Sequence, residues 1–204
     1  MPNKCLPNEF WFDQESHVYR LNGKIIPSVT GILSDAGLFD YRGVPPEVME
    51  AARLFGQAVH RATELYDMES LDMATVNEPL IPYLEAWKKF RADFKVVIYP
   101  SWIEKPICSY KYQFGTIPDR ICSIGNKVTL IEVKSTATIQ KAVAIQMGGQ
   151  EIVVEENYGK VRQRIAVQLK PDGTYRIEEF KNPTDKTVFI SALNVWRWRK
   201  ENNG

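Results

Sequence analysis

Alternating and helically spaced apolar residues divide this chain into a clear succession of segments. Residues 10–29 have the composition of short strands on both sides of Asn22-Gly23, a dipeptide that favours the positive φ values of a tight turn. This segment predicts a β-hairpin. Apolar residues then recur at helical spacing from Pro45 to about Tyr66, and again from about Pro79 to Phe94. Two helices are therefore expected before the main run of strands.

The remaining segments predict a sheet with helices packed on it. Residues rich in β-branched and aromatic side chains occupy 96–103, 107–114, 117–124 and 127–134, and later 161–169 and 175–180. Turns are predicted at Gly125-Asn126 and at Pro171-Asp172-Gly173, and helices over 137–156 and from about Asp185 to Lys200. The pair Gly148-Gly149 should weaken the first of these helices by about 1 kcal/mol per glycine. The order predicts an α/β (α+β) fold with a central mixed sheet flanked by helices.

Length and composition favour a single domain over residues 1–204. A chain of 204 residues with 44% hydrophobic content can bury one core. The hairpin and first helices would occupy 1–95, and the sheet with its other helices 96–204. No apolar run reaches the roughly 18 residues that a membrane span needs, and the polar start MPNKCLPNEF does not look like a signal peptide. We therefore expect no membrane partner and a cytoplasmic location, which is the host cytoplasm if the gene is carried by a phage.

Charge and cysteine content exclude some classes of function. Lys and Arg total 26 against 25 Asp and Glu, so the net charge of +1 gives no overall attraction to a polyanion, and a nucleic-acid site must be local. Cations do gather in the C-terminal third, where a solvated face is an equally good interpretation: Lys160, Arg162, Arg164, Lys170, Arg197, Arg199 and Lys200. Three cysteines, Cys5, Cys108 and Cys122, are too few for a four-cysteine cluster and are expected to be buried or incidental thiols.

The densest chemical signal is Pro118-Asp119 followed by Glu132-Val133-Lys134. Carboxylates on two strands joined by a tight turn can converge on a divalent cation, and hard oxygen ligands suit Mg²⁺ or Mn²⁺. Alternation along the strand would place Glu132 and Lys134 on one face and turn Val133 into the core. A cation there would activate water, and the ammonium group would stabilise charge that grows on a phosphate. The pattern predicts phosphodiester hydrolysis, while a purely structural Glu132–Lys134 ion pair at a sheet edge stays open.

Several short motifs, taken in order, resemble a known nuclease family. They are HVYRLNGKIIPSVTGIL, GQAVHRATE, PYLEAWKKF, GTIPDRI, LIEVKS and IQMGGQEIVV. Their order and spacing are similar to the PD-(D/E)XK superfamily, in particular to its RecB-like and phage (lambda-type) exonuclease branch. The resemblance implies a restriction-endonuclease-like core. It also implies that Asp119 and Glu132 bind metal, that the Val133 carbonyl joins them, and that Lys134 is the catalytic lysine.

The same resemblance adds residues from two helices. His60, in GQAVHRATE, matches the histidine that RecB-like nucleases place on a helix near the metal, where it is expected to be a ligand. Gln146 matches the glutamine that begins the Gln-x-x-x-Tyr motif beside the active site. The tyrosine position of this motif holds Gln150 here, so the chain departs from the pattern. Glu64 lies four residues after His60 on the same helix face and could bind metal directly or through water, or pair with Arg61.

Other polar and aromatic residues carry weaker signals. Ser28, Thr30 and Arg53 could hold a phosphate at the mouth of the cleft, although helix capping and surface solvation explain them equally well. His17, in the hairpin, is expected to be structural. Two tryptophans of the last predicted helix, Trp196 and Trp198, could stack on bases, but core packing is the favoured interpretation.

The sequence thus favours a metal-dependent DNA nuclease, in particular an exonuclease that serves recombination or repair in a phage or mobile element. Two alternatives remain: a non-catalytic nucleic-acid-binding protein on a nuclease fold, and a structure-specific endonuclease. No GxSxG, P-loop or GxGxxG motif supports a serine hydrolase or a nucleotide-binding enzyme. DNA is the expected partner, and the resemblance leaves open a homo-oligomer, since lambda exonuclease is a ring-shaped trimer, and a recombination partner protein.

Overall fold

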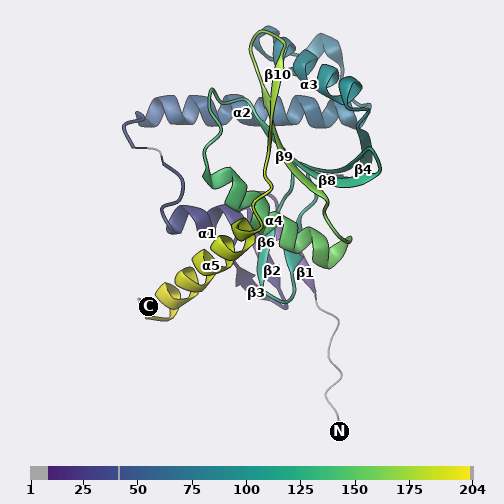
Figure 1. The fold of residues 1–204 in the computed structure, drawn as a ribbon. Helices are drawn as coiled ribbons and strands as arrows, with labels where there is room; N and C mark the ends of the chain where they lie inside the picture. The colour runs from purple at the N-terminus through teal and green to yellow at the C-terminus, as the bar shows by residue number, and fades with distance from the viewer. Residues whose placement is uncertain (1–8, 41, 203–204) are drawn as a thin grey trace.

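The computed structural model describes residues 9–40 and 42–202, which form a mixed sheet with helices on both faces (Figure 1). The predicted hairpin is confirmed. Strands β1 (Phe10–Asp13), β2 (Val18–Leu21) and β3 (Lys24–Ile26) pair antiparallel in chain order. Asn22 (φ 52°) and Gly23 (φ 77°) both adopt the left-handed conformation in the turn between β2 and β3, as that dipeptide favours.

Three helices come before the central sheet. Ser28 caps the short helix α1 (Val29–Asp35), because its Oγ accepts a hydrogen bond from the Gly31 N–H at 2.9 Å. The other two are the predicted pair, α2 (Pro46–Asp67) and α3 (Ile81–Asp93), joined through the short 3₁₀ turns η1 (Met73–Thr75) and η2 (Glu78–Leu80).

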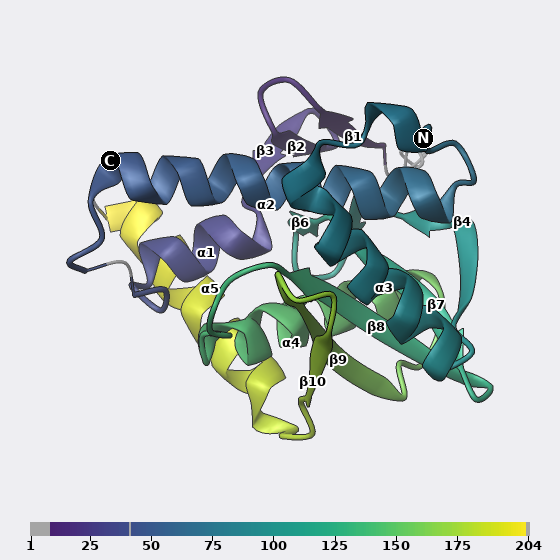
Figure 2. The ribbon, with the colours of Figure 1, turned by 90° about the horizontal axis from the view of Figure 1, so that it is seen from above.

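Only the second half of α2 is packed into the molecule. Val59 and Ala62 are buried, whereas Val48, Met49 and Leu54 are exposed, although all five follow the same helical spacing. The first half of the helix extends beyond the edge of the sheet (Figure 2). Periodicity therefore predicted the helix correctly and did not indicate how far the core would cover it.

The central sheet is mixed, as the sequence predicts. Within the described residues its order is β10-β9-β8-β7-β4, with β8 and β9 parallel and the other neighbours antiparallel. The strands are β4 (Val97–Ile103), β7 (Arg120–Ile124), β8 (Lys127–Lys134), β9 (Gln163–Leu169) and β10 (Tyr175–Glu179). The tight turn at Gly125-Asn126 joins β7 to β8 and so brings the two segments that carry the acidic motif side by side.

One predicted strand is wrong. Residues 107–114 form β5 (Ile107–Ser109), a turn, and the start of β6 (Phe114–Thr116), and these two strands pair with each other outside the central sheet. The turn closes through the Ser109 hydroxyl, which accepts from the Tyr112 N–H at 2.8 Å, while Gln113 takes a positive φ of 48°. Because the turn contains no glycine, proline or asparagine, its residues give little sign of it in the sequence.

Two helices from the C-terminal half cover one face of the sheet. Helix α4 (Ala142–Asn157) begins five residues later than predicted, and α5 (Thr184–Asn202) completes the chain. The two helices cross closely at the glycine pair. A Cβ on Gly148 would lie 2.8 Å from the Asp185 backbone, and one on Gly149 would lie 2.8 Å from the Phe189 ring. The glycines that weaken α4 as an isolated helix therefore permit its contact with α5.

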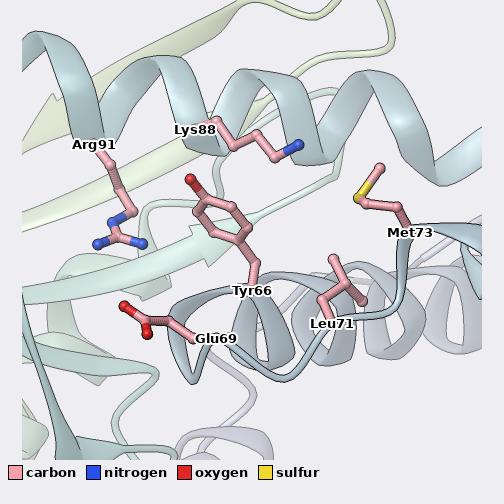
Figure 3. Close-up of a pocket in the computed structure, with 6 residues that line it drawn as sticks. All are labelled: Tyr66, Glu69, Leu71, Met73, Lys88 and Arg91. Atoms are coloured by element: carbon pink, nitrogen blue, oxygen red, sulfur yellow. The ribbon is translucent and has the colours of Figure 1, made fainter.

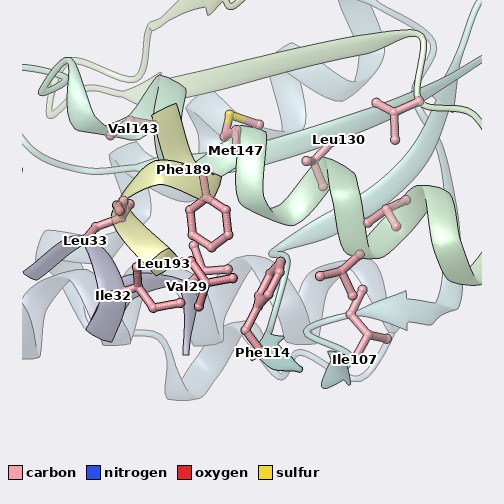
Figure 4. Packing of buried hydrophobic residues seen from close by; sticks show 14 of the residues in the cluster. Val29, Ile32, Leu33, Ile107, Phe114, Leu130, Val143, Met147, Phe189 and Leu193 are labelled. Carbon is pink, nitrogen blue, oxygen red and sulfur yellow. The ribbon is translucent and has the colours of Figure 1, made fainter. Parts of the chain in front are cut away.

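Alternation along the strands gives the sheet two apolar faces. Leu130 and Ala166 join the cluster formed with α1, α4 and α5 (Figure 4), in which Met147 and Phe189 are fully buried. Ile131, Val133 and Val167 face the opposite way and pack with residues of α2 and α3. Among the described helices, none is long and apolar enough to span a membrane.

Candidate active site

The acidic motif lies where β7 begins and β8 ends. Pairing of Arg120 with Ile131 places Asp119 beside the end of β8, and the Val133 N–H donates a hydrogen bond to Asp119 Oδ2 at 2.6 Å. Val133 itself is fully buried and packs on the α2–α3 face. Glu132 and Lys134 share the other side, as expected from strand alternation, and Lys134 Nζ donates to Glu132 Oε1 at 2.7 Å.

Two glutamines from α4 donate hydrogen bonds to the Glu132 carboxylate. Gln146 Nε2 donates to Oε1 at 2.7 Å, and Gln150 Nε2 donates to Oε2 at 3.2 Å. Both glutamines are buried, and they lie one helical turn apart, so they meet the same carboxylate. Gln150, where the resembled motif has tyrosine, thus supplies a second amide donor to Glu132. Its own Oε1 is buried without a hydrogen-bond partner within the described residues.

His60 reaches the site from α2. Its Nδ1 lies 3.5 Å from Asp119 Oδ1 and 3.5 Å from Glu104 Oε1. Gly56, one turn earlier on α2, lies next to the end of β8, since a Cβ built there would be 3.7 Å from Ser135 Oγ, an ordinary van der Waals distance. The histidine predicted from GQAVHRATE therefore lies beside the predicted acid, although the two are distant in sequence.

Glu104 is a member of this cluster that the sequence did not indicate. It follows β4 directly, and its charge next to Lys105 looks like ordinary surface polarity in the sequence. Its backbone takes a positive φ of 45°, and its N–H donates to the Asp119 carbonyl at 3.2 Å. An acid immediately after a strand that will neighbour β7 is the one signal that could have pointed to it.

The ionisable groups of the site change one another's pKa values. Burial, together with the negative charge of Glu132, raises the pKa of Asp119 to about 7. Burial alone would lower the pKa of His60, but the charge of Asp119 and the contact with Glu104 outweigh it and raise that pKa to about 9. For Glu132, burial opposes ionisation, yet the Lys134 ammonium and its hydrogen bond bring the pKa below the ordinary value. The negative charges of the neighbouring carboxylates therefore still act on Asp119, although the charges of His60 and Lys134 oppose them.

The donor set fits a divalent cation. His60, Glu104 and Asp119 each offer one ligand atom, and these atoms all lie within 4.8 Å of one another. One imidazole nitrogen with carboxylate oxygens is a set that suits Mg²⁺ or Mn²⁺, and a cation would neutralise the charge that raises the pKa of Asp119. The Glu132 carboxylate is close enough to Asp119 to act on it electrostatically, while its oxygens are bonded to Lys134 and the two glutamines.

Glu64 and the predicted phosphate contacts have other partners. Glu64 Oε2 pairs with Arg61 at 2.8 Å and does not belong to the metal-ligand group. Ser28 is used as the cap of α1, with Thr30 Oγ1 3.4 Å from its hydroxyl. Arg53 pairs with Glu50 at 2.7 Å on the exposed half of α2. Phosphate binding by these residues stays a prediction.

The predictions for His17 and for the two tryptophans of α5 have different outcomes. His17 packs edge-on against Phe12 and Tyr19, in keeping with a structural role. Trp196 packs against the main core, but Trp198 is 62% exposed, so core packing is wrong for that residue. Residues 198–202, the last of α5, are all exposed, so the core does not extend to Trp198.

The cations and cysteines can also be placed. Arg164, counted among the cations of a basic face, is instead buried, with Nη2 3.0 Å from Asp185 and Nε 3.2 Å from Glu151. This carboxylate pair explains why a cation occupies a central strand. Cys108 and Cys122 are free and buried, as expected, and Cys5 lies outside the described residues.

A pocket of about 370 Å³ lies apart from the acidic cluster, where α2 ends and α3 passes it (Figure 3). Tyr66 stands at its centre, with Lys88 Nζ and the Arg91 guanidinium each 5.3 Å from the ring centroid. Glu69, Leu71 and Met73 complete the lining. The cations here are already in contact with the aromatic ring and with acids, since Lys88 pairs with Glu85 and Arg91 with Asp67.

Comparison with known proteins gives structural neighbours only. No family model matches the sequence, and no curated protein matches it. Among solved structures, the chain is similar to an alkaline exonuclease (LHK-Exo) from Laribacter hongkongensis, with 12% identity, a TM-score of 0.41 and coverage of 86% of this chain and 93% of that chain. It is also similar to a candidate exonuclease from Eubacterium rectale, with 11% identity, a TM-score of 0.44 and coverage of 84% and 76%. At these values the function must be inferred from the side chains of the site.

Proposed function

We propose that this protein is a divalent-metal-dependent nuclease that hydrolyses phosphodiester bonds in DNA. One observation carries the proposal: Asp119, Glu132, Lys134 and His60 converge from three elements on one buried, acid-rich site. Burying carboxylates and an ammonium group costs several kcal/mol unless they are well compensated. The intact set of two acids and a lysine argues against a binding protein without turnover, and a simple Glu132–Lys134 ion pair would not need His60, Asp119 and two glutamines around it.

Each side chain has a definite part in such a reaction. Asp119 and His60 would hold the cation, with Glu132 beside them. The resemblance adds the Val133 carbonyl as a further oxygen ligand. When bound, the cation supplies Lewis-acid stabilisation of the charge that grows on the phosphate and lowers the pKa of water.

Lys134 would also act on the negative charge that grows on the phosphate during the reaction. Its ammonium is oriented by the 2.7 Å hydrogen bond to Glu132, and it can orient the attacking water or stabilise the pentacovalent transition state. Gln146 does not need to touch the substrate, because its amide is already bonded to Glu132 and fixes that carboxylate.

The resemblance in motif order extends the proposal to an exonuclease that acts on DNA ends and leaves 5′-phosphate products. A phage or mobile-element recombination role, a homo-oligomer and a recombination partner protein belong to the same extension. End dependence separates the exonuclease from a structure-specific endonuclease, because a covalently closed circle offers no end. It is therefore the first property to measure after cleavage itself.

The test is an assay on end-labelled linear duplex, single-stranded DNA and closed circular DNA, with Mn²⁺, Mg²⁺ or EDTA. We expect cleavage of a linear substrate that EDTA abolishes and that Lys134→Ala lowers by about 100-fold or more. Lys89→Ala changes an exposed lysine of α3 and serves as the matched control. Equal activity of wild type and Lys134→Ala, or no metal-dependent cleavage of any form, would contradict the proposal.

A further inference from the structure

Glu104 occupies a position that the motif residues do not account for. Its Oε1 lies 3.5 Å from His60 Nδ1, and it shares one compact group of ligand atoms with His60 and Asp119. We propose that Glu104 is a direct ligand of the divalent cation, an inference that rests on the proposed nuclease function. The centre then has one nitrogen and two carboxylates from α2, from the end of β4 and from the start of β7.

The backbone at Glu104 is arranged to direct this carboxylate. The ladder between β4 and β7 shifts register between Ile98 and Ile103, which then pairs with Arg120. Glu104 follows with a positive φ of 45°, a conformation that costs a residue with a Cβ about 1 kcal/mol or more. Its N–H donates to the Asp119 carbonyl at 3.2 Å, so the strained residue is tied to the main chain of the acid it accompanies.

A structural ion pair with Arg120 does not explain Glu104. Arg120 is fully buried, and its Nε donates to Asp67 Oδ2 at 2.7 Å, so its short ion pair is with this buried carboxylate, which Arg91 shares. The contact from Arg120 Nη1 to Glu104 Oε1 is much longer, 3.4 Å. Nη1 instead makes a short bond of 2.6 Å to the Asp119 carbonyl. Arg120 thus steadies the site, while the Glu104 carboxylate has no short ion pair with it.

Exposure indicates which side of the cluster a cation can reach. The side chains of Glu104 and His60 are 26% and 29% exposed, against 8% for Asp119. Asp119 therefore forms the floor of the site, and Glu104 and His60 form its solvent-facing wall. A hydrated cation arriving from solvent meets Glu104 early, and hard carboxylate oxygens suit it.

The first experiment measures Mn²⁺ binding to the full chain without DNA, by the loss of the electron paramagnetic resonance signal of free Mn²⁺. We expect Glu104→Gln to weaken binding at least 10-fold, since the isosteric amide removes the charge. Glu156→Gln is the matched control, because that carboxylate accepts from the Ser109 hydroxyl at 2.7 Å and has no part in the cluster. It should bind Mn²⁺ as wild type does.

A comparison with Asp119→Asn separates the two levels of the proposal. If Glu104→Gln binds like wild type while Asp119→Asn loses binding, the role of Glu104 is overturned and the metal centre stands. If Asp119→Asn also binds like wild type, the proposed metal centre itself fails. Circular dichroism of each variant shows that the fold is retained.

A second experiment distinguishes direct ligation from positioning of His60. Glu104→Cys presents a soft thiolate, so Cd²⁺ added to this variant should produce a thiolate-to-metal ultraviolet absorption that EDTA abolishes. Wild type and Glu156→Cys control for the native buried thiols, Cys108 and Cys122, and for a new thiol outside the cluster. Absence of the band in folded Glu104→Cys would show that Glu104 only positions its neighbours, and direct ligation would be overturned.

Discussion

The guanidinium of Arg120 donates from Nε to Oδ2 of Asp67 at 2.7 Å, and both side chains are wholly buried. Asp67 lies at the end of α2, two turns after His60, and it also accepts from Trp87 Nε1 at 3.0 Å and from Arg91 at 2.7 Å. Arg120 in turn bonds the Asp119 carbonyl. The ion pair therefore locks the helix that carries His60 to the strand that follows Asp119.

Breaking this pair should destabilise the whole protein. Asp67→Ala leaves a buried guanidinium without its carboxylate, and we expect a loss of about 3–5 kcal/mol in the free energy of unfolding, measured by urea titration. The double variant Asp67→Leu/Arg120→Met removes both charges and should recover more than half of that loss. A loss below about 1 kcal/mol in Asp67→Ala would show that the pair contributes little.

Gln146 should affect the site without supporting the fold. Gln146→Leu removes the 2.7 Å hydrogen bond to Glu132 Oε1, so the carboxylate loses one of the hydrogen bonds that fix its orientation. We expect Mn²⁺-dependent cleavage to fall by about 10–100-fold, with a thermal midpoint close to that of wild type. Gln140→Leu is the control, because its amide bonds to the backbone of Asp40 and lies outside the site. Equal cleavage by the two variants would contradict a positioning role.

Two helical glycines should respond in opposite directions to alanine. Gly148→Ala places a Cβ 2.8 Å from the Asp185 backbone, so overpacking should destabilise the protein by about 1–3 kcal/mol. Gly56→Ala meets only Ser135 Oγ, at 3.7 Å, and should stabilise it by about 0.5–1 kcal/mol through helix propensity. Urea unfolding measures both. If both variants were stabilised alike, helix propensity alone would determine the stability change at these positions, and the predicted overpacking at Gly148 would be wrong.

Alkaline pH should weaken the fold through Cys122. Burial raises the pKa of its thiol from 9.0 to about 12. Above pH 9 the unfolded chain has therefore lost a proton that the folded protein still holds, so stability falls as the pH rises, by about 1.4 kcal/mol per pH unit. Cys122→Ala lacks this contribution, and its stability deficit relative to wild type should shrink by about 2 kcal/mol between pH 8 and pH 10.5.

The measurement is urea unfolding of both proteins at each pH, with Ser123→Ala as a control on the same strand. The control changes a neighbouring side chain that does not titrate in this range, so its offset from wild type should stay constant. A constant offset for Cys122→Ala as well would mean that the buried thiol ionises at its ordinary pH.

Local pattern determined much of the fold and the centre of the site. Period-2 alternation predicted β8 and correctly sent Val133 into the core while leaving Glu132 and Lys134 on one side. Helical spacing and the Asn22-Gly23 turn were equally reliable, because propensity and turn geometry act over a few neighbouring residues. Asp119, Glu132 and Lys134 could be predicted for the same reason: they lie close together in the chain and in the sheet.

Tertiary structure alone decided what distant segments do to one another. Glu104 joins His60 and Asp119 only because the register of β4 shifts and α2 crosses the sheet end, and no local pattern records either event. The burial of Arg164, the exposure of Trp198 and the close contact at Gly148 also depend on which element packs opposite each residue. Sequence specifies local geometry and the types of donor available, whereas the composition of the candidate metal-ligand cluster depends on long-range packing, which brings atoms of three separate segments within 4.8 Å of one another.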